Sequence, residues 1–374
     1  MEPFSHLLNL LGTIQDPRRA QGQLYKLSHL RLFAILAVMA GANSYRAIHS
    51  FVDVHLDQLK EIFGLRWRRA PAYTSLRLVL QQLDGAELER IFRIHSAVLA
   101  DQIGCAGVRV VAVDGKPLRG SFDHFADRAA VHLVSAFEVT STLILGHIEV
   151  GEKENEIPAV QRLLADIGVA HRLVTADAMH CQKKTFEDAC DAGAVLIAQV
   201  KGNQPSLLGA VRSLCLEQAP QDRIETRDRH RGRQELRTVE VFPLRPEVLD
   251  PAWQDLLNGV IRVTRERIDR CSKTGLWKSH TDETAYYVTA EPLSAAVAAN
   301  AVRSHWGIEN RAHHVRDVTM AEDASRVRKN PGILARIRSF AANILRANGV
   351  KNMRDARYRL AIGGIDALFR YRLT

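Results

Sequence analysis

Residues 108–115, VRVVAVDG, are a short run of β-branched and small apolar residues that ends at Asp114 and Gly115. A run of this kind, closed by residues typical of turns, indicates a buried strand. Further runs of the same character are VHLVSAFEVTSTLILGHIEV at 131–150, HRLVTADA at 171–178 and AVLIAQVKG at 194–202. We therefore predict several strands of one sheet, the first of which ends at Asp114.

Helical patterns lie between these strands. NEIPAVQRLLADIG at 155–168 and CQKKTFEDACDAG at 181–193 space their apolar residues as on one helix face and close with a glycine. Strands that alternate with helices predict an α/β core with a mixed sheet.

Helices are also expected on both sides of this core. Residues 1–100 carry apolar clusters at three- and four-residue intervals, which predicts an N-terminal all-helical domain. A catalytic domain over 105–374 follows, with a charged, mainly β insertion at about 205–285. Two long helical patterns, 294–318 and 332–348, follow the insertion.

Composition favours a polyanionic partner. The 374 residues include 51 Lys and Arg against 42 Asp and Glu, a formal net charge of +9. Nucleic acid is the first expectation and a basic housekeeping enzyme is the alternative. The five cysteines form no CxxC pair, so neither a disulfide framework nor a zinc site is expected.

We expect neither a membrane-spanning segment nor an export signal. Its start does not resemble a secretory signal, and no apolar run approaches the roughly 20 residues that span a bilayer. We expect a cytoplasmic protein, in the compartment that also holds a bacterial nucleoid.

Two aspartates stand at strand ends. Asp114 closes VRVVAVD and Asp177 closes HRLVTAD. Ligand sites in open α/β sheets lie outside the carboxyl ends of the strands, where both side chains would project. Such hard oxygen ligands suit Mg²⁺ or Mn²⁺. The alternative is that each aspartate only initiates a turn.

A third carboxylate, Glu309, lies in the predicted helix at 294–318. His305 is four residues before it, His313 four after and Arg316 seven after, so an α-helix would place all four on one face. That face could hold a metal beside a phosphate backbone, with Arg316 contacting phosphate oxygens. The alternative is an ordinary solvated helix face.

Three carboxylates on one sheet edge and an adjoining helix could hold two divalent ions about 4 Å apart. Such a pair activates water or a 3′-hydroxyl and stabilises the leaving oxygen of an in-line phosphoryl displacement. Nuclease and strand-transfer chemistry both fit, and the spacing does not separate them.

Five sequence blocks together resemble the DDE transposases of the ISAs-type, or H-repeat-associated, insertion-sequence family. In order they are VAVDGKPLRGS, KENEIPAVQRLL, VTADAMHCQKKT, VKGNQPSL and HWGIENRAHHVRDVTMAEDASRVR, at 111–121, 153–164, 174–185, 200–207 and 305–328. The N-terminal DPRRAQGQLYKLSHL, MAGANSYRAI and AYTSLRLVLQQLD resemble the helical domain associated with that family. The resemblance therefore covers nearly the whole chain.

The resemblance implies a ribonuclease H-like fold, two Mg²⁺ ions that Mn²⁺ can replace, and Asp114, Asp177 and Glu309 as catalytic metal ligands. It also implies double-stranded DNA partners, namely the element's terminal inverted repeats and the target, and a homodimer or higher multimer that synapses two ends.

The helix of Glu309 departs from the wider superfamily. There, a Tyr, an Arg three residues later, the Glu and a Lys seven past the Glu recur; here these positions are Val302, His305, Glu309 and Arg316. Because the Tyr is absent and His replaces Arg, a DNA hairpin intermediate is left open.

Other polar residues are candidates for DNA contact. Lys116 and Arg119 closely follow Asp114, and the loop RDRHRGRQELR at 227–237 contains five arginines. For each, a solvated turn or loop is the alternative. The full set of DNA-binding candidates is Lys116, Arg119, Lys201, Asn203, Gln204, Arg231, Arg233, His305, Asn310, His313 and Arg316.

The N-terminal helices offer a second DNA-binding candidate. SYRAIHSFVDVH at 44–55 and APAYTSLRLVLQQL at 70–83 could form a helix-turn-helix variant, with Arg66, Arg68 and Arg69 on the backbone. The connection is longer than the usual three or four residues, so helical packing without base readout is the alternative.

Three functions remain open at this point. The leading one is a transposase that cuts at its element's ends and joins 3′-hydroxyls to target DNA. The others are a catalytically silent DNA-binding derivative and a metal-dependent nuclease without strand transfer.

Overall fold

The computed structural model describes residues 4–104, 107–122, 129–151, 154–230, 232–244, 247, 249–271, 274–280 and 283–372. The chain divides into two compact units. The first unit comprises Met1–Ala106, Gly115–Glu156 and Ile308–Thr374, and the second comprises Gly107–Asp114 and Ile157–Gly307.

The first unit begins with helices, as the apolar periodicity of residues 1–100 predicts. They are α1 (Ser5–Gly12), α2 (Leu27–Met39), α3 (Tyr45–Val54), α4 (Leu56–Phe63), α5 (Tyr73–Gln81) and α6 (Gly85–Ile103), with a 3₁₀ turn at Ala20–Gly22. The most apolar, α2, is buried on nearly every side. Asp84 accepts hydrogen bonds from two backbone N–H groups at the start of α6, and Gly104 ends it with φ +58°.

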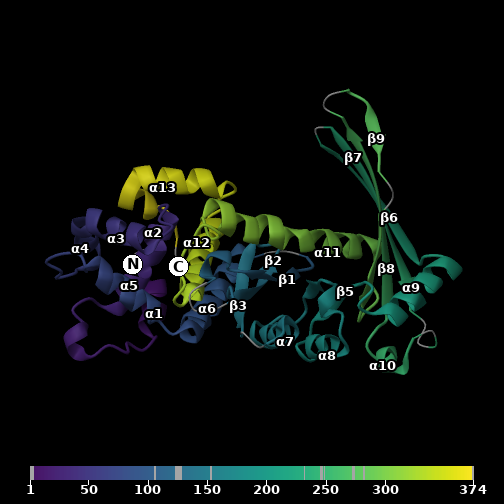
Figure 1. Ribbon diagram of the computed structural model, residues 1–374, viewed down its shortest axis with the longest axis horizontal. Coiled ribbons are helices and arrows are strands. Elements are labelled where there is room, and N and C mark those ends of the chain that lie inside the picture. The colour runs from purple at the N-terminus through teal and green to yellow at the C-terminus, as the bar shows by residue number, and fades with distance from the viewer. Residues whose placement is uncertain are drawn as a thin grey trace. The chain divides into compact units, whose positions relative to one another are not determined.

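The rest of the first unit packs on these helices. Strands β2 (His132–Glu138) and β3 (Leu143–Val150) form an antiparallel pair. The buried helix α12 (Pro331–Ala347) packs against α2, α6 and β3 (Figure 1), and α13 (Met353–Leu368) packs against α2. A 3₁₀ turn at Arg119–Ser121 and two π-helical stretches, Ile308–His313 and Val315–Thr319, complete the unit.

The second unit is the α/β part of the chain. Its strands are β1 (Val110–Pro117, of which Val110–Asp114 belong here), β4 (Leu173–Ala176), β5 (Val195–Val200), β6 (Asp222–His230), β7 (Arg233–Pro243), β8 (Gly259–Arg270), β9 (Trp277–Ser279) and β10 (Glu283–Thr289). They follow the order β1-β4-β5-β10-β8-β7-β6, with β9 beside β8. Strands β1, β4 and β5 are parallel, and the later strands are antiparallel.

Helices α7 (Glu156–Asp166), α8 (Lys183–Asp191), α9 (Pro205–Glu217), α10 (Pro251–Gln254) and α11 (Ala295–Gly307) accompany this sheet. The apolar side of α11 packs against β4, β6 and β7 through Ala298, Ala301 and Val302. The stretch 205–285 thus opens with a helix and becomes mainly β from Asp222. Strand β9 and the start of β7 reach away from the helices of this unit (Figure 1). The expected mixed α/β fold with a large sheet and an N-terminal helical region is confirmed.

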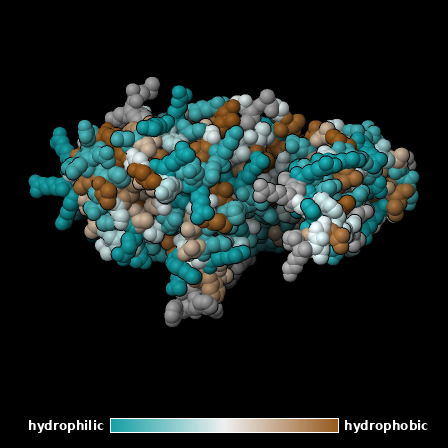
Figure 2. Space-filling model, turned by 90° about the horizontal axis from the view of Figure 1, so that it is seen from above, coloured by the Kyte–Doolittle hydropathy of each residue, from teal (hydrophilic) through white to brown (hydrophobic). Residues whose placement is uncertain are grey.

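On the face drawn in Figure 2, hydrophilic residues predominate and hydrophobic ones form separate small groups. Among the described residues, no helix is both long and apolar enough to cross a membrane.

Candidate active site

Asp114 and Asp177 occupy equivalent positions on neighbouring parallel strands. The pairing of β1 with β4 places Val110 opposite Leu173 and Ala112 opposite Thr175. Each aspartate lies two residues beyond the last of these pairs. Because side chains alternate across a strand, both aspartates fall on the face that carries Thr175. Asp177 directly follows β4 as the sequence predicts, but β1 continues to Pro117, so the prediction that this strand ends at Asp114 is wrong. The two carboxylates come from neighbouring parallel strands, at the same distance beyond the last paired residues.

His305, in the last turn of α11, lies at the same edge. Its Nδ1 is 3.1 Å from the Oγ1 of Thr175, two residues before Asp177 on β4. Burial lowers the pKa of His305, and the carboxylates of Asp114 and Asp177 partly oppose this by favouring the charged imidazole. The imidazole of His305 therefore interacts electrostatically with both aspartates.

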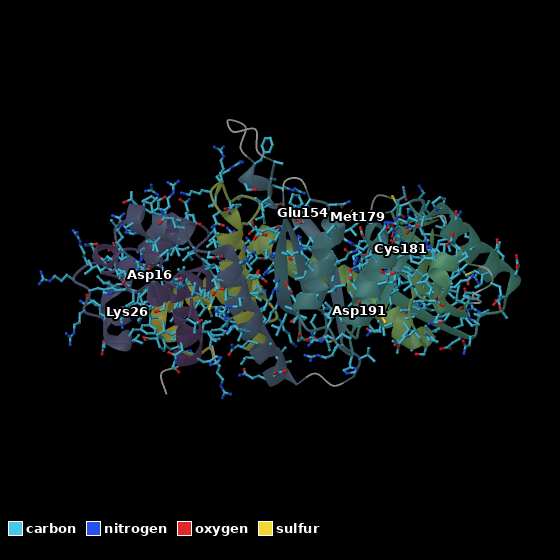
Figure 3. All side chains as sticks on the ribbon, turned by 90° about the horizontal axis from the view of Figure 1, so that it is seen from below. Asp16, Lys26, Glu154, Met179, Cys181 and Asp191 are labelled. Atoms are coloured by element: carbon cyan, nitrogen blue, oxygen red, sulfur yellow. The ribbon has the colours of Figure 1, made fainter. Side chains whose placement is uncertain are left out.

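A short turn follows Asp177. This is the 3₁₀ turn Ala178–His180, and Asp177 is its N-cap residue. The Oδ1 of Asp177 accepts a hydrogen bond of 3.0 Å from the backbone N–H of Met179. The Asp177 side chain is 47% exposed, so the other carboxylate oxygen has room for an outside ligand. Figure 3 labels Met179 and Cys181 in this turn.

Two amide side chains hold the turn from outside. Asn203 Nδ2 donates to the carbonyl oxygen of Ala178 at 2.6 Å, and Gln204 Nε2 donates to that of Cys181 at 2.9 Å. The sequence singled out both residues for DNA contact only through their block. Their bonds to the protein's own backbone were not foreseen, since no local pattern pairs residues 23 and 25 positions apart.

Glu309 belongs to the first unit, as the second residue of the π-helix Ile308–His313. It is exposed, as is Asn310. The turns of a π-helix are wider than those of an α-helix. The expectation that Glu309, His313 and Arg316 share one face is wrong, because His313 is 7% exposed and Arg316 is fully buried.

Lys116 and Arg316 are buried around Glu322, also in the first unit. Lys116 Nζ lies 2.9 Å and Arg316 Nε 3.5 Å from Glu322 Oε1, and Arg338 Nη1 lies 3.8 Å from Oε2. Lys116 also pairs with Asp317. Burial opposes ionisation of Glu322, but the three cations outweigh it and lower its pKa to about 2.

These contacts correct three of the expected DNA-binding residues. The guanidinium of Arg316 reaches the hydroxyls of Ser135 and Ser339 and the Nδ1 of His313, at 3.5, 3.4 and 3.2 Å. Arg316 and His313 are therefore interior groups, and Lys116 is 8% exposed. None of the three offers a surface for phosphate, because each is enclosed by the first unit.

Comparison with known families identifies the chain. A family model described as "Transposase DDE domain" matches residues 107–344, and "DDE_Tnp_1-associated" matches residues 8–96. The chain belongs to the DDE transposase family.

Relatives of this transposase carry related names. A putative transposase YncI of Escherichia coli O157:H7 is 32% identical over 362 residues, which is 93% of this chain and 90% of the relative. The H repeat-associated putative transposase YhhI of Escherichia coli K12 is 31% identical over 352 residues, 91% and 90% of the two chains. A solved piggyBac transposase synaptic complex with hairpin DNA covers 99% of this chain and 79% of that one, at 11% identity and a TM-score of 0.39, a likeness too weak to bear on the fold.

Among the described residues of the predicted set, Arg119 and Lys201 are the accessible basic ones. Arg119 has a side chain that is 75% exposed and lies 3.6 Å from Asp323 in the first unit. Lys201, at the end of β5 in the second unit, is exposed. Arg231 lies outside the described residues, and Arg233 is half-buried and paired with Glu235.

Most arginines of the β strands are paired. Arg265 lies 3.1 Å from both Glu235 and Glu283, and Arg262 lies 2.7 Å from Glu240. These carboxylates neutralise much of the charge of the neighbouring arginines. The described residues of 222–270 therefore offer fewer unpaired arginines for phosphate binding than their composition indicates.

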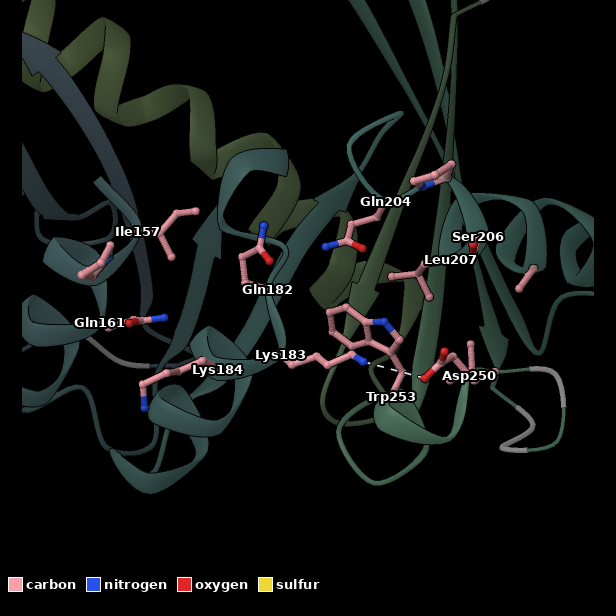
Figure 4. Close-up of a pocket in the computed structure, with 14 residues that line it drawn as sticks. Ile157, Gln161, Gln182, Lys183, Lys184, Gln204, Ser206, Leu207, Asp250 and Trp253 are labelled. Atoms are coloured by element: carbon pink, nitrogen blue, oxygen red, sulfur yellow. Dashed lines mark ion pairs between the residues drawn. The ribbon is translucent and has the colours of Figure 1, made fainter. Parts of the chain in front are cut away.

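A pocket of about 730 Å³ opens beside α8, α9 and α10 (Figure 4). Gln182, Gln204 and Trp253 are among its lining residues, and Lys183 at its edge lies 3.7 Å from Asp250. Gln204 therefore lines the pocket while its amide holds the turn after Asp177.

The N-terminal segments expected to resemble a helix-turn-helix form α3 and α5, with α4 between them. They are not consecutive helices of such a motif. Arg66, Arg68 and Arg69 are exposed in the connection that follows α4.

Proposed function

We propose that this chain cleaves DNA at the ends of its insertion sequence and joins the resulting 3′-hydroxyls to target DNA, in a reaction that depends on Mg²⁺. Asp114, Asp177 and Glu309 are the proposed catalytic metal ligands. The observation that carries the proposal is that Asp114, in β1, and Asp177, directly after β4, each lie two residues beyond the paired Ala112 and Thr175 of neighbouring parallel strands.

The donor set at this edge suits a hard divalent cation. Carboxylate oxygens are the ligands that Mg²⁺ and Mn²⁺ prefer, and the half-exposed Asp177 leaves space for water and substrate oxygens. Among the described residues, no group of three or more His, Cys, Asp or Glu side chains is already gathered as a metal site. Bound there, such cations would supply activation of water or a 3′-hydroxyl and charge stabilisation at the leaving oxygen.

The chain's own groups have separate tasks. Asp114 and Asp177 present oxygen ligands from two rigid parallel strands, and Glu309 presents a third from an exposed helical position. The hydrogen bond to Thr175 orients His305 toward the same edge. Exposed Arg119 and Lys201 are proposed phosphate contacts, which position DNA without reading its sequence. Two DNA ends must be brought together, so we propose that the chain acts as a dimer or higher multimer.

The test uses purified full-length protein, end-labelled duplexes carrying the element's terminal inverted repeats, and a supercoiled target plasmid. We expect end-specific nicks and joined products with Mg²⁺ or Mn²⁺, and neither after chelation with EDTA. Asp114→Asn, Asp177→Asn and Glu309→Gln should each abolish both products while leaving end binding intact. Asp191→Asn, at an exposed aspartate of the second unit, is the matched control.

Other outcomes decide between the alternatives. Cutting of any DNA without joining identifies a nuclease, and end binding without cleavage identifies a silent derivative. Joining by any of the three carboxylate variants would show that the triad is wrong.

A further inference from the structure

The turn that follows Asp177 is fixed at both ends by side chains of one neighbouring loop. Asn203 bonds to the carbonyl of Ala178, directly after the aspartate, and Gln204 bonds to that of Cys181, directly after the turn. The loop between β5 and α9 therefore holds the beginning and the end of the turn that the aspartate starts.

The backbone hydrogen bonds that close the turn, from His180 N–H to the Asp177 oxygen and from Cys181 N–H to the Ala178 oxygen, are both 3.2 Å long. Met179 N–H also donates to Asp177 Oδ1 at 3.0 Å, and Gln182 N–H donates to the His180 oxygen at 2.8 Å. Strand β4 before the turn has only four residues. The two amide bonds, at 2.6 and 2.9 Å, are shorter than the two bonds that close the turn. Without them, the backbone at Asp177 would be less well fixed.

The loop that supplies the amides has hydrogen bonds of its own. Gln204 is the N-cap residue of α9, with Pro205 at the first helical position. Its N–H donates to the Lys201 oxygen at 3.0 Å, and its own oxygen accepts from Leu208 N–H at 2.9 Å. Strand β5, on the other side of the loop, pairs in parallel with β4, the strand that leads to Asp177. The loop with both amides thus follows a strand that is hydrogen-bonded to the strand before Asp177.

We propose that Asn203 and Gln204 are positioning residues for the carboxylate of Asp177. They set the backbone from which Asp177 offers its free oxygen to a divalent cation, and they do not touch DNA. This inference rests on the proposed function, in which Asp177 is a metal ligand. Outer groups that orient metal ligands commonly change metal affinity or activity by about 10–100-fold when removed.

Neutral variants test this without adding charge near the metal. Asn203→Ala and Gln204→Met remove the donors. Matched controls are Asn258→Ala and Gln254→Met, since Asn258 donates to Ala290 at 2.8 Å and Gln254 donates to Leu249 at 3.0 Å, bonds of the same kind in the same unit. Thermal unfolding shows whether each variant is folded. If Asn203→Ala does not fold, Gln204→Met alone tests the proposal, because it acts on the same turn.

The measurements are Mn²⁺ affinity by electron paramagnetic resonance, the Mg²⁺ dependence of end cleavage, and DNA-end affinity in EDTA. We expect both test variants to weaken Mn²⁺ binding and raise the Mg²⁺ requirement by about tenfold or more. The DNA-end affinity of both test variants in EDTA should equal that of the wild type. The two control variants should equal the wild type in all three measurements. Unchanged metal dependence, or reduced DNA affinity alone, overturns the proposal.

Failure of the proposed function gives a different pattern. Suppose that the wild type binds Mn²⁺ through Asp177, as shown by loss of affinity in Asp177→Asn, but never cleaves DNA ends. This result would refute the proposed function. The positioning role would still be tested by the Mn²⁺ affinity of the two amide variants. If Asp177→Asn does not alter Mn²⁺ affinity, both proposals fall together.

Discussion

His305 and Thr175 meet through a hydrogen bond of 3.1 Å between Nδ1 and Oγ1, although 130 positions separate them in the chain. Thr175 is 3% exposed and lies two residues before Asp177. The contact fixes the ring of a residue in α11 against the strand that carries one of the proposed metal ligands.

We expect Thr175→Val to keep the fold and lower end cleavage by about tenfold, because the near-isosteric side chain cannot orient the imidazole. The lost hydrogen bond should reduce the free energy of unfolding by only about 1 kcal/mol. Cleavage rates and chemical denaturation measure the two effects. Thr289→Val is the control, since its hydroxyl donates to the Glu291 oxygen at 3.1 Å in the same unit. Equal activity in the two variants would contradict the orienting role.

Glu322→Gln should destabilise the protein by on the order of 3–5 kcal/mol, because it leaves three buried cations without their shared carboxylate. Urea denaturation at neutral pH measures this. The control, Glu87→Gln, removes an exposed pair in which Arg90 lies 3.0 Å away, and it should cost less than about 1 kcal/mol. A Glu322→Gln variant as stable as the control would show that the buried pairs contribute little.

Acid should weaken the protein through the same group. The folded-state pKa of Glu322, about 2, lies below the ordinary value of 4.5, so its ionisation stabilises the folded state above about pH 4.5. That contribution is lost as the pH falls from 4.5 toward 2. Buried Glu89, whose pKa His147 and Arg336 lower to about 2 against the effect of burial, should behave alike. As the pH is lowered through this window, the free energy of unfolding should therefore decrease more steeply for the wild type than for Glu322→Gln.

Gly120→Ala should destabilise the first unit. A Cβ there would clash with the backbone oxygen of Ser325, which cannot move as a flexible side-chain end could. Overpacking of this kind costs about 1–3 kcal/mol. Gly12→Ala is the control, because its nearest outside neighbour would be the Ser28 Cβ at 4.0 Å. Thermal unfolding distinguishes them, and a Gly120→Ala midpoint equal to the control's would refute the close approach.

Arg119→Gln and Lys201→Gln should each weaken DNA-end binding and reduce the slope of log K against log salt by about 1, as expected for loss of one phosphate contact. Arg359→Gln is a matched control, since that side chain is 78% exposed and its partner Asp355 lies in the same helix. Binding measured across a salt series by fluorescence anisotropy tests this. An unchanged slope in both variants would place DNA elsewhere.

The sequence predicts that both aspartates lie in or next to strands of one sheet, because runs of β-branched residues precede each of them. The structure pairs Ala112 with Thr175, and each aspartate lies two residues further on. The extension of β1 to Pro117 was not foreseen, because Gly115 and Pro117 are typical of turns. The mixed α/β class followed from the same local patterns.

The surroundings of the basic residues could not be predicted from the sequence in the same way. Whether Lys116 and Arg316 meet solvent depends on Glu322, which the fold brings to both of them. Spacing gives no sign of such a shared partner. The amides of Asn203 and Gln204 likewise bind backbone carbonyls, which every residue has, so nothing in the sequence marks their targets.

The π-helical stretches from Ile308 to Thr319 also affect how relatives should be compared. Met320 N–H donates to the oxygen of Val315, five residues earlier, at 3.0 Å. Counting residues from Glu309 therefore does not assign the same direction to a side chain here and in a relative whose helix is α throughout. Equal spacing from Glu309 therefore does not by itself make Arg316 the counterpart of a lysine seven positions past the glutamate in a relative whose helix is α throughout.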